Sequence, residues 1–238
     1  MERPEVADPA QAVAVATERL AVRPGDDAAH EARARALITL DRLEEAEADA
    51  MDAVRLDPDE VRYRELLAEI QSRRGEHADA AAEYARLARR DPRQVAWTVA
   101  EAAERIEGSD AAKGVDAARR AVRLDPKNYE AQLALARGLV HLGDAGALSA
   151  ARRATDLRPA DRAGRETLAD ALWLAGREAD AFHELRALAH ELSGDDCTRV
   201  VAKARTLYRA RAGWFGRVVA ALPALFAVAF RRGWLTVS

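Results

Sequence analysis

The residues in this sequence that could carry catalytic or metal chemistry are five histidines, one cysteine and scattered carboxylates. His183 and His190 are seven residues apart, so they would share one face of a helix. A zinc site needs several nitrogen, sulfur or oxygen ligands. Only Glu184 and Glu191 stand near this pair, and no cysteine completes the set. Two surface histidines explain the pattern better than a metal site does.

Cys197 follows two aspartates, an arrangement that a reactive thiol could use. An aspartate that caps a helix, followed by an ordinary thiol, is the simpler interpretation. The sequence contains no nucleophile elbow, P-loop or dinucleotide fingerprint, and the nearest glycine pair, Gly213 and Gly216, lacks the rest of a phosphate motif. The sequence therefore predicts a protein that is not an enzyme and has no cofactor and no metal.

The composition predicts an all-α fold. Apolar residues make up 49% of the 238 residues and aromatic residues only 5%, so alanine and leucine must supply most of the packing. Alanine has the highest helix propensity, and no sustained alternation typical of strands occurs. The single cysteine excludes a disulfide framework and suits a reducing compartment. The N-terminus lacks the basic residues followed by an apolar run that make up a signal peptide, so we expect a cytoplasmic protein. The alanine- and arginine-rich composition suggests a bacterial source.

Five prolines set a period in the sequence: Pro24, Pro58, Pro92, Pro126 and Pro159, at intervals of 34, 34, 34 and 33 residues. A fixed period of this length is typical of stacked helix-turn-helix repeats. A generic helical bundle with accidental proline spacing is the alternative. This alternative is disfavoured because small residues and turn glycines recur with the same period as the prolines.

Two small residues in each unit mark the place where two helices would cross closely. In the first helices they are Ala34, Ala68, Ala102, Ala136 and Ala169, and in the second helices Ala46, Ala80, Gly114, Ala147 and Ala181. Larger apolar residues recur at matching offsets: Leu37, Leu139, Leu172, Tyr84 and Leu185. Gly75, Gly143 and Gly176 stand between the two helices, where a left-handed residue would end the first one.

These motifs resemble the tetratricopeptide repeat (TPR) family, most closely in Leu67-Ala68, Gly75, Ala80, Tyr84 and Asp91-Pro92. Glu101, Arg105 and Ser109 depart from the family pattern, and the turn near Asp144 is one residue short. The resemblance implies a right-handed α-solenoid with capping helices. The expected parts are an N-terminal half repeat (1–26), five repeats (27–60, 61–94, 95–128, 129–161 and 162–195), a capping helix (196–212) and a C-terminal segment (213–238).

The resemblance also implies a binding groove lined by fixed positions of each first helix. At these positions the N-terminal repeats carry polar residues of mixed charge and the C-terminal repeats carry apolar ones. Trp173 could anchor a bound peptide or pack against the capping helix. The carboxylate clamp of chaperone-binding members is not present. The residues expected to contact a peptide or protein partner are Arg35, Arg62, Arg73, Val99, Ile106, Leu133, Arg137, Val140, Trp173 and Leu174.

The C-terminal segment differs sharply in charge from the rest. Residues 197–238 contain eight basic side chains and no acidic ones, whereas residues 1–196 hold 29 basic and 40 acidic side chains. Tryptophans flank an uncharged run from Val218 to Phe230 that is too short, as a helix, for a bilayer core. Residues expected to contact an anionic membrane surface, at the inner face, are Trp214, Phe215, Arg217, Leu222, Leu225, Phe226, Phe230, Arg231, Arg232 and Trp234.

Two alternatives for the C-terminal segment stay open at this point. The segment could fold back onto the repeats, which would occupy its own groove, or pair with a second copy in a homo-oligomer. Nucleic-acid binding is a further alternative, since basic and aromatic residues can contact phosphates and bases. The thirteen-residue uncharged run argues against it. The sequence therefore favours an adaptor that binds a protein partner, with a membrane-contacting or self-associating tail.

Overall fold

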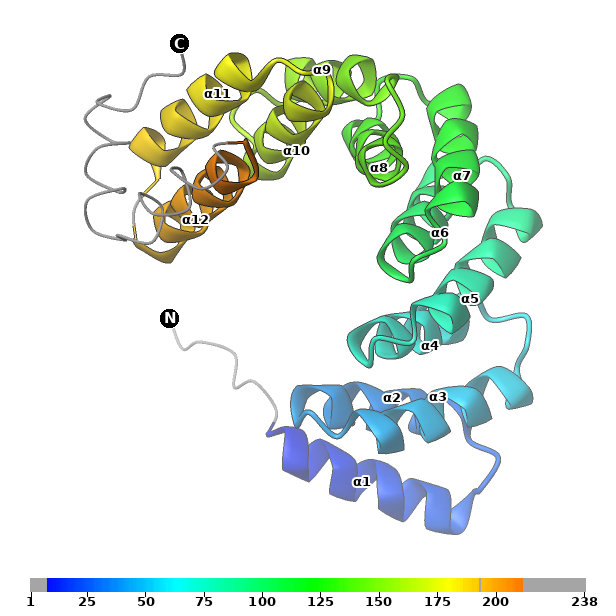
Figure 1. Ribbon diagram of the computed structural model, residues 1–238. Helices are drawn as coiled ribbons and strands as arrows, with labels where there is room; N and C mark the ends of the chain where they lie inside the picture. Colours follow the sequence, from blue (N-terminus) through cyan, green and yellow to red (C-terminus); the bar gives the residue numbers. More distant parts are fainter. Residues whose placement is uncertain (1–7, 193, 212–238) are drawn as a thin grey trace, which may run out of the picture. The chain divides into compact units, whose positions relative to one another are not determined.

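The computed structural model describes residues 8–192 and 194–211, and in this part of the chain every regular element is an α-helix (Figure 1). The all-α prediction is confirmed for these residues. The helices are α1 (Pro9–Val22), α2 (Asp27–Thr39), α3 (Leu43–Leu56), α4 (Val61–Arg73), α5 (His77–Arg90), α6 (Val95–Glu107), α7 (Ala111–Leu124), α8 (Tyr129–His141), α9 (Ala147–Leu157), α10 (Arg162–Leu174), α11 (Glu178–Glu191) and α12 (Gly194–Arg211).

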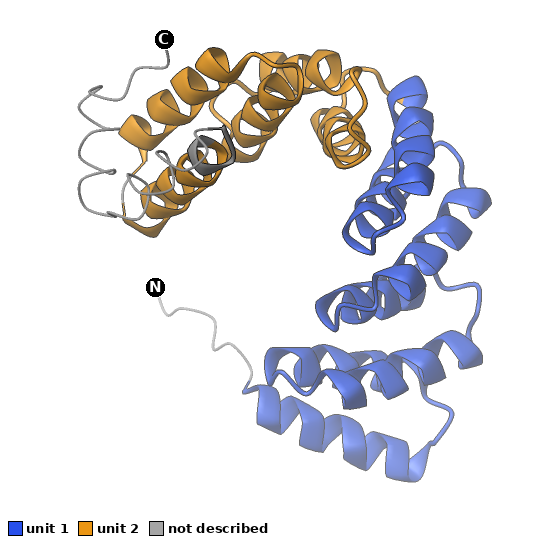
Figure 2. Ribbon diagram, in the orientation of Figure 1, with its two compact units in different colours: residues 1–124 blue, residues 125–238 orange. Residues whose placement is uncertain are grey.

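The helices fall into two compact units, residues 1–124 and 125–238 (Figure 2). In the first unit α2, α4 and α6 each pack against the helix that follows, and the resulting pairs stack through α3 on α4 and α5 on α6. In the second unit α8 packs on α9 and α10 on α11, and α10 contacts both helices of the preceding pair. Each unit is therefore a stack of helix-turn-helix pairs, the solenoid arrangement that the period predicts.

A left-handed residue ends the first helix of each pair at the same position of the repeat. Glycine takes this conformation in three turns, with φ of 78° at Gly75, 67° at Gly143 and 71° at Gly176. Asp41 and Ser109 stand at the equivalent position in the other two turns, with φ of 57° and 69°. Ser109 is thus a departure in residue type but not in backbone geometry. This position favours glycine, because a residue with a Cβ is strained in the left-handed conformation.

The small residues predicted at the helix crossings form the centre of each pair. Ala34, Ala68, Ala102, Ala136 and Ala169 are completely buried. Gly114 is the glycine of the set, and a Cβ added to it would lie 2.6 Å from Ile106 Cγ1 and 3.1 Å from the Ala102 carbonyl oxygen. The missing side chain at Gly114 therefore makes room for Ile106 between α6 and α7.

An extra helix covers the last pair of the second unit. Cys197, Val200, Val201 and Ala204 of α12 are buried in a cluster with residues of α10 and α11, and Leu207 packs against it. The acidic residues Asp195 and Asp196 lie in the first turn of α12, where carboxylates interact favourably with the helix dipole. At the other end of the chain α1 packs on α2 and buries Ala16 and Leu20. Both helices cover apolar faces that terminal repeats otherwise expose.

Candidate partner-binding surface

The exposed side of the first helices α2, α4 and α6 carries a set of charged residues and one tryptophan. We call it the first-helix surface, and its residues are Glu31, Arg35, Arg62, Glu65, Glu69, Arg73 and Trp97. Equivalent helices in a stack present their side chains to the same side, because each pair repeats the geometry of the one before. Three of the four arginines predicted to contact a partner belong to this set, and the fourth, Arg137, lies on α8.

Two of these arginines share one carboxylate. Arg35 Nε donates to Glu31 Oε1 over 3.0 Å, and Arg62 Nε lies 3.4 Å from Glu31 Oε2. The arginine side chains are 54% and 51% exposed, whereas that of Glu31 is 12% exposed. The structure therefore brings Arg35 of α2 and Arg62 of α4 together over a nearly buried acid, with their guanidinium groups accessible to a partner.

Arg62 also lies over an aromatic ring on its own helix. Its guanidinium carbon is 5.0 Å from the centroid of the Tyr63 ring, and the Tyr63 hydroxyl donates to Asp27 Oδ2 over 3.0 Å. Burial, together with Asp27, raises the pKa of Tyr63, so the phenol stays protonated and keeps donating at neutral pH. These contacts limit the rotamers of Arg62 and fix where its charge is displayed.

Trp97 joins the surface between α4 and α6, and the sequence analysis did not predict it as a site residue. Its Nε1 donates to Glu65 Oε1 over 2.6 Å, and the Trp97 side chain is half-buried. On the same helix as Glu65, Arg73 pairs with Glu69 at 2.9 Å. The only available sequence signal was the residue type, because aromatic anchors with a polar tip are enriched at interfaces.

Two predicted partner contacts are buried instead, and this corrects the prediction. Ile106 is only 3% exposed, because it fills the space beside Gly114. Leu133 is 9% exposed, because it packs in one cluster with Tyr129 of its own helix, Ala154 of α9 and Ala163 of α10. Neither side chain can contact a bound partner in this structure. Val99, which is also predicted on α6, is half-buried.

In the second unit the remaining predicted residues differ in exposure. Arg137 is exposed, Val140 is half-buried, and Leu174 is 40% exposed at the end of α10. Trp173 is half-buried and meets Phe182 edge to face, with ring centroids 6.0 Å apart and planes at 86°. It packs against the cluster that α12 completes. The structure therefore shows Trp173 packed on the apolar residues of this cluster.

Helix α12 also binds polar groups of α10. Lys203 Nζ donates to Asp170 Oδ2 over 2.6 Å and to the Glu166 carbonyl oxygen over 3.2 Å. Arg162 pairs with Asp196 in the first turn of α12. Asp170 and the Glu166 carbonyl oxygen on α10 are therefore engaged by α12.

The predicted membrane contacts lie outside the described residues. They are Trp214, Phe215, Arg217, Leu222, Leu225, Phe226, Phe230, Arg231, Arg232 and Trp234. Within residues 8–192 and 194–211, no helix combines the length and apolar character needed to cross a membrane. In that same part of the chain, no three His, Cys, Asp or Glu side chains gather as metal ligands would.

Comparison with solved structures identifies the fold. A tetratricopeptide repeat protein from Parabacteroides merdae ATCC 43184 matches with a TM-score of 0.69 at 15% identity, covering 92% of each chain. YrrB, described as a TPR protein with an unusual peptide-binding site, matches with a TM-score of 0.59 at 15% identity over 84% of this chain and 99% of its own. MamA from Desulfovibrio magneticus RS-1 has a TM-score of 0.56 at 17% identity, over 64% and 85% respectively.

These likenesses establish that the chain has the TPR fold, as its repeat motifs predict. At identities of 15% to 17% they establish the fold alone. No protein-family model matches the sequence, and no curated protein matches it either.

Proposed function

We propose that this protein is a non-catalytic adaptor that binds a peptide segment of a partner protein on the first-helix surface. The observation that carries the proposal is the pair of exposed guanidinium groups, Arg35 and Arg62, positioned over Glu31 on adjacent repeats. Arginine and tryptophan are the residue types that contribute most to protein interfaces. The YrrB structure, described as having a peptide-binding site, provides a precedent on the same fold.

The first-helix surface favours a partner peptide that carries both charge signs and an apolar residue. Arg62 and Arg73 can exchange their internal carboxylate partners for those of a peptide, while Glu65 and Glu69 can accept its basic groups. Trp97 offers an apolar ring next to these charges. Stacked repeats suit an extended or helical ligand, since their equivalent positions recur along the array.

Selection from a library of random displayed peptides on the full chain would test this function. The selected peptides are then titrated against Arg62→Glu/Arg73→Glu and against a control, Arg55→Glu/Arg119→Glu. The control arginines lie on second helices, are 69% and 51% exposed, and pair with acids three residues away. Both variants change the net charge equally. We expect the first to weaken binding about tenfold or more and the control to leave it unchanged. Equal affinity for both variants would contradict the proposed site.

We also propose that residues 213–238 place the adaptor on an anionic membrane surface. The support comes from sequence alone: an uncharged run between Arg217 and Arg231-Arg232, with Trp214 and Trp234 outside it. Co-sedimentation of the full chain with anionic and neutral vesicles tests it, beside the variant Arg217→Glu/Arg231→Glu/Arg232→Glu. We expect salt-sensitive binding to anionic vesicles that the variant loses. If the chain binds neither vesicle type but self-associates in sedimentation analysis, the segment belongs to an oligomer interface instead.

A further inference from the structure

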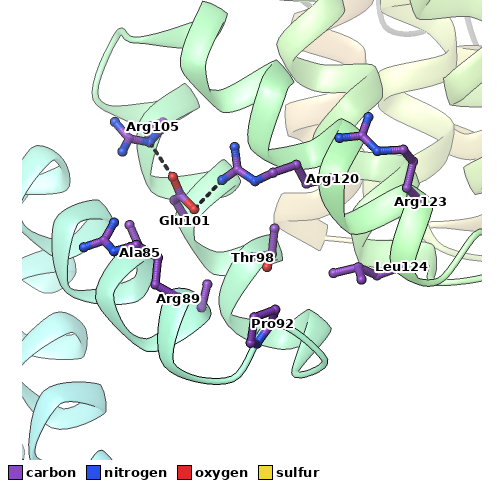
Figure 3. A pocket seen from close by; sticks show the side chains of 10 residues that line it. Ala85, Arg89, Pro92, Thr98, Glu101, Arg105, Arg120, Arg123 and Leu124 are labelled. Carbon is purple, nitrogen blue, oxygen red and sulfur yellow. Dashed lines mark hydrogen bonds and ion pairs between the residues drawn. The ribbon is translucent and has the colours of Figure 1, made fainter.

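A pocket of about 680 Å³ lies in the first unit between α5, α6 and α7 (Figure 3). The apolar part of its lining consists of Ala85, Ala88, Pro92 and Leu124. None of the lining residues belongs to the first-helix surface, and none is aromatic. A volume of this size is typical of ligand pockets, so the pocket has room for an apolar side chain of a partner.

The pocket exists where side chains are shorter than at the same positions one repeat earlier. Thirty-four residues before Ala88 and Thr98 stand Val54 and Arg64. Val54 packs on the apolar cluster of the first repeats, and Arg64 reaches Glu83 over 2.9 Å. Ala88 and Thr98 occupy less space than these two side chains. Space that is filled at one junction between repeats is therefore open at the next.

Four arginines and a single carboxylate also line the pocket. Glu101 is 5% exposed and accepts hydrogen bonds from Arg105 Nε at 3.0 Å and from an Arg120 guanidinium nitrogen at 2.7 Å. Figure 3 shows both of these guanidinium groups meeting at Glu101. Because one acid serves two arginines and the other two are Arg89 and Arg123, the lining has an excess of three positive charges.

Arg89 and Arg123 are exposed, and they form no ion pair with any residue in the described part of the chain. Figure 3 shows their guanidinium groups on opposite sides of the pocket, pointing apart. A single small anion therefore cannot bind both. Each side of the pocket needs an anionic group of its own, and the apolar lining lies between them.

The helices on both sides of the pocket are basic beyond its lining. Residues 85–90 of α5 and 117–124 of α7 each contain three arginines and no acid. The next acids in the sequence, Asp91 and Asp125, lie in the turns after these helices, where each accepts a backbone amide over 3.0 Å. An extended partner that lies across α5 and α7 therefore meets positive charge on either side of the pocket.

We propose that this pocket binds an acidic segment of a partner protein, with an apolar side chain in the pocket and separate carboxylates at Arg89 and Arg123. A guanidinium group binds a carboxylate through two parallel hydrogen bonds. Nucleic acid also carries separate anions, but its bases need rings on which to stack, and the lining has none. The site goes beyond the proposed function, because it gives the adaptor a second partner away from α2, α4 and α6.

Titration calorimetry of the full chain with the acetylated, amidated peptide Gly-Glu-Glu-Leu-Glu-Glu-Gly tests the proposal. Two matched peptides separate its parts: glutamine replaces every glutamate in one, and glycine replaces the leucine in the other. We expect each to bind about tenfold more weakly than the first peptide. Equal affinity for the glutamate and glutamine peptides would overturn the anion sites. Equal affinity with and without leucine would overturn the role of the pocket.

Variants of the two unpaired arginines locate the binding. Arg89→Gln and Arg123→Gln should each weaken binding of the glutamate peptide about threefold or more, and the effects should add in the double variant, because the arginines bind separate carboxylates. Arg152→Gln/Arg153→Gln, at two exposed arginines of α9 in the other unit, changes the net charge equally and should bind as the wild type does. Unchanged affinity in Arg89→Gln/Arg123→Gln would overturn the site.

A variant of the first-helix surface separates this site from the proposed function. Arg62→Gln/Arg73→Gln removes the same charge from α4, and we expect it to bind the glutamate peptide as the wild type does. Loss of binding in this variant, with none in Arg89→Gln/Arg123→Gln, would assign the acidic peptide to the first-helix surface and overturn the pocket. Thermal unfolding of each variant checks that the folded chain is being titrated.

A ten-residue oligothymidylate tests the other class of extended anion. We expect it to bind more weakly than the glutamate peptide at the same salt concentration, since the pocket offers its bases no aromatic ring. Tighter binding of the oligothymidylate, lost in Arg89→Gln/Arg123→Gln, would assign the pocket to single-stranded nucleic acid and overturn the protein partner.

Discussion

His30 Nδ1 lies 2.8 Å from Asp49 Oδ1, and this buried contact joins the two helices of one repeat across nineteen residues. Arg64 and Glu83 form the same link in the next repeat at 2.9 Å, and Arg165 and Glu184 form it in the last at 2.5 Å. The spacing is nineteen residues in each case. Three of the five repeats therefore have a polar link between their helices in addition to the alanine crossings.

Asp49→Asn should destabilise the protein substantially. The side chain of Asp49 is 5% exposed and binds both His30 and Arg33, the latter through contacts of 2.7 Å. Removing its charge leaves a largely buried Arg33 without its acid, at a cost of about 2–3 kcal/mol in the free energy of unfolding. Urea denaturation measures this cost. Asp52→Asn, at a 42% exposed partner of Arg55, should change it by less than about 0.5 kcal/mol. A similar loss of unfolding free energy in Asp49→Asn and Asp52→Asn would contradict the prediction that burial makes the Asp49 contacts more important.

Glycine should stabilise the two turns where another residue takes the left-handed conformation. Ser109→Gly relieves the steric cost of φ at 69°, offset by the greater freedom of glycine in the unfolded chain. We expect a gain of about 0.5–1 kcal/mol and a higher Tm. Asp41→Gly should gain less, because aspartate tolerates this region better.

The reverse substitution provides the control for the turns. A Cβ added at Gly75 meets nothing within 4 Å, so Gly75→Ala tests the backbone conformation alone. It should lower the free energy of unfolding by about 1 kcal/mol, as read from thermal and urea unfolding. A stabilised Gly75→Ala would show that the left-handed turn is not formed in solution.

Gly114→Ala should be costly for a different reason. The added Cβ would lie 2.6 Å from Ile106 Cγ1 and 3.1 Å from the Ala102 carbonyl oxygen, so α6 and α7 must separate. We expect a loss of about 1–3 kcal/mol in urea unfolding. Gly25→Ala, where the nearest atom would be 3.8 Å away, should be close to neutral. In the double variant Gly114→Ala/Ile106→Ala the clashing Cγ1 is absent, so the loss should be smaller than the sum of the losses in the two single variants.

Asp161 should make one part of the stability depend on acid pH. It caps α10 by accepting from the Gly164 amide at 3.0 Å and also accepts from the Tyr129 hydroxyl. The Tyr129 hydrogen bond is the main cause that lowers the pKa of Asp161 below its usual range. Burial and Asp161 raise the pKa of Tyr129, which therefore remains a donor throughout this pH range.

A lowered carboxyl pKa in the folded state stabilises the fold above the unfolded pKa, and this contribution is lost as the pH falls below about 4. The difference in urea midpoint between wild type and Asp161→Asn should therefore be present at pH 7 and shrink at pH 3. Asp156→Asn, at an exposed aspartate of α9, is the control and should differ little from wild type at either pH. If the difference in urea midpoint between wild type and Asp161→Asn is the same at pH 7 and pH 3, the predicted pH dependence is wrong.

The repeat frame was predictable because it depends on local rules. Glycine at a left-handed turn, alanine at a close crossing and proline after a helix recur at fixed offsets, and the structure buries the five first-helix alanines completely. The backbone conformation of Ser109 could not be predicted from these local rules. Its residue type departs from the pattern, yet its backbone follows the other turns, since the same hydrogen bond closes the helix end, here from the Asp110 amide to the Arg105 carbonyl oxygen over 2.8 Å.

The site was harder to predict because side-chain exposure depends on several helices together. Ile106 points inward since its neighbour on α7 is a glycine, which no rule about α6 alone would reveal. Trp97 is held at the surface by Glu65 of the preceding repeat.

The thiol of Cys197 offers a direct measure of how the end of the array opens. It is 1% exposed, donates to the Ala189 carbonyl oxygen at 3.4 Å, and is the chain's single cysteine. A disulfide reagent can therefore reach it only when α12 detaches from α11. The labelling rate, followed against urea, would report the free energy of fraying at this end separately from that of global unfolding. In a solenoid, stability is approximately a sum over repeats and the interfaces between neighbours. The free energy of fraying therefore measures the interface between α12 and α11.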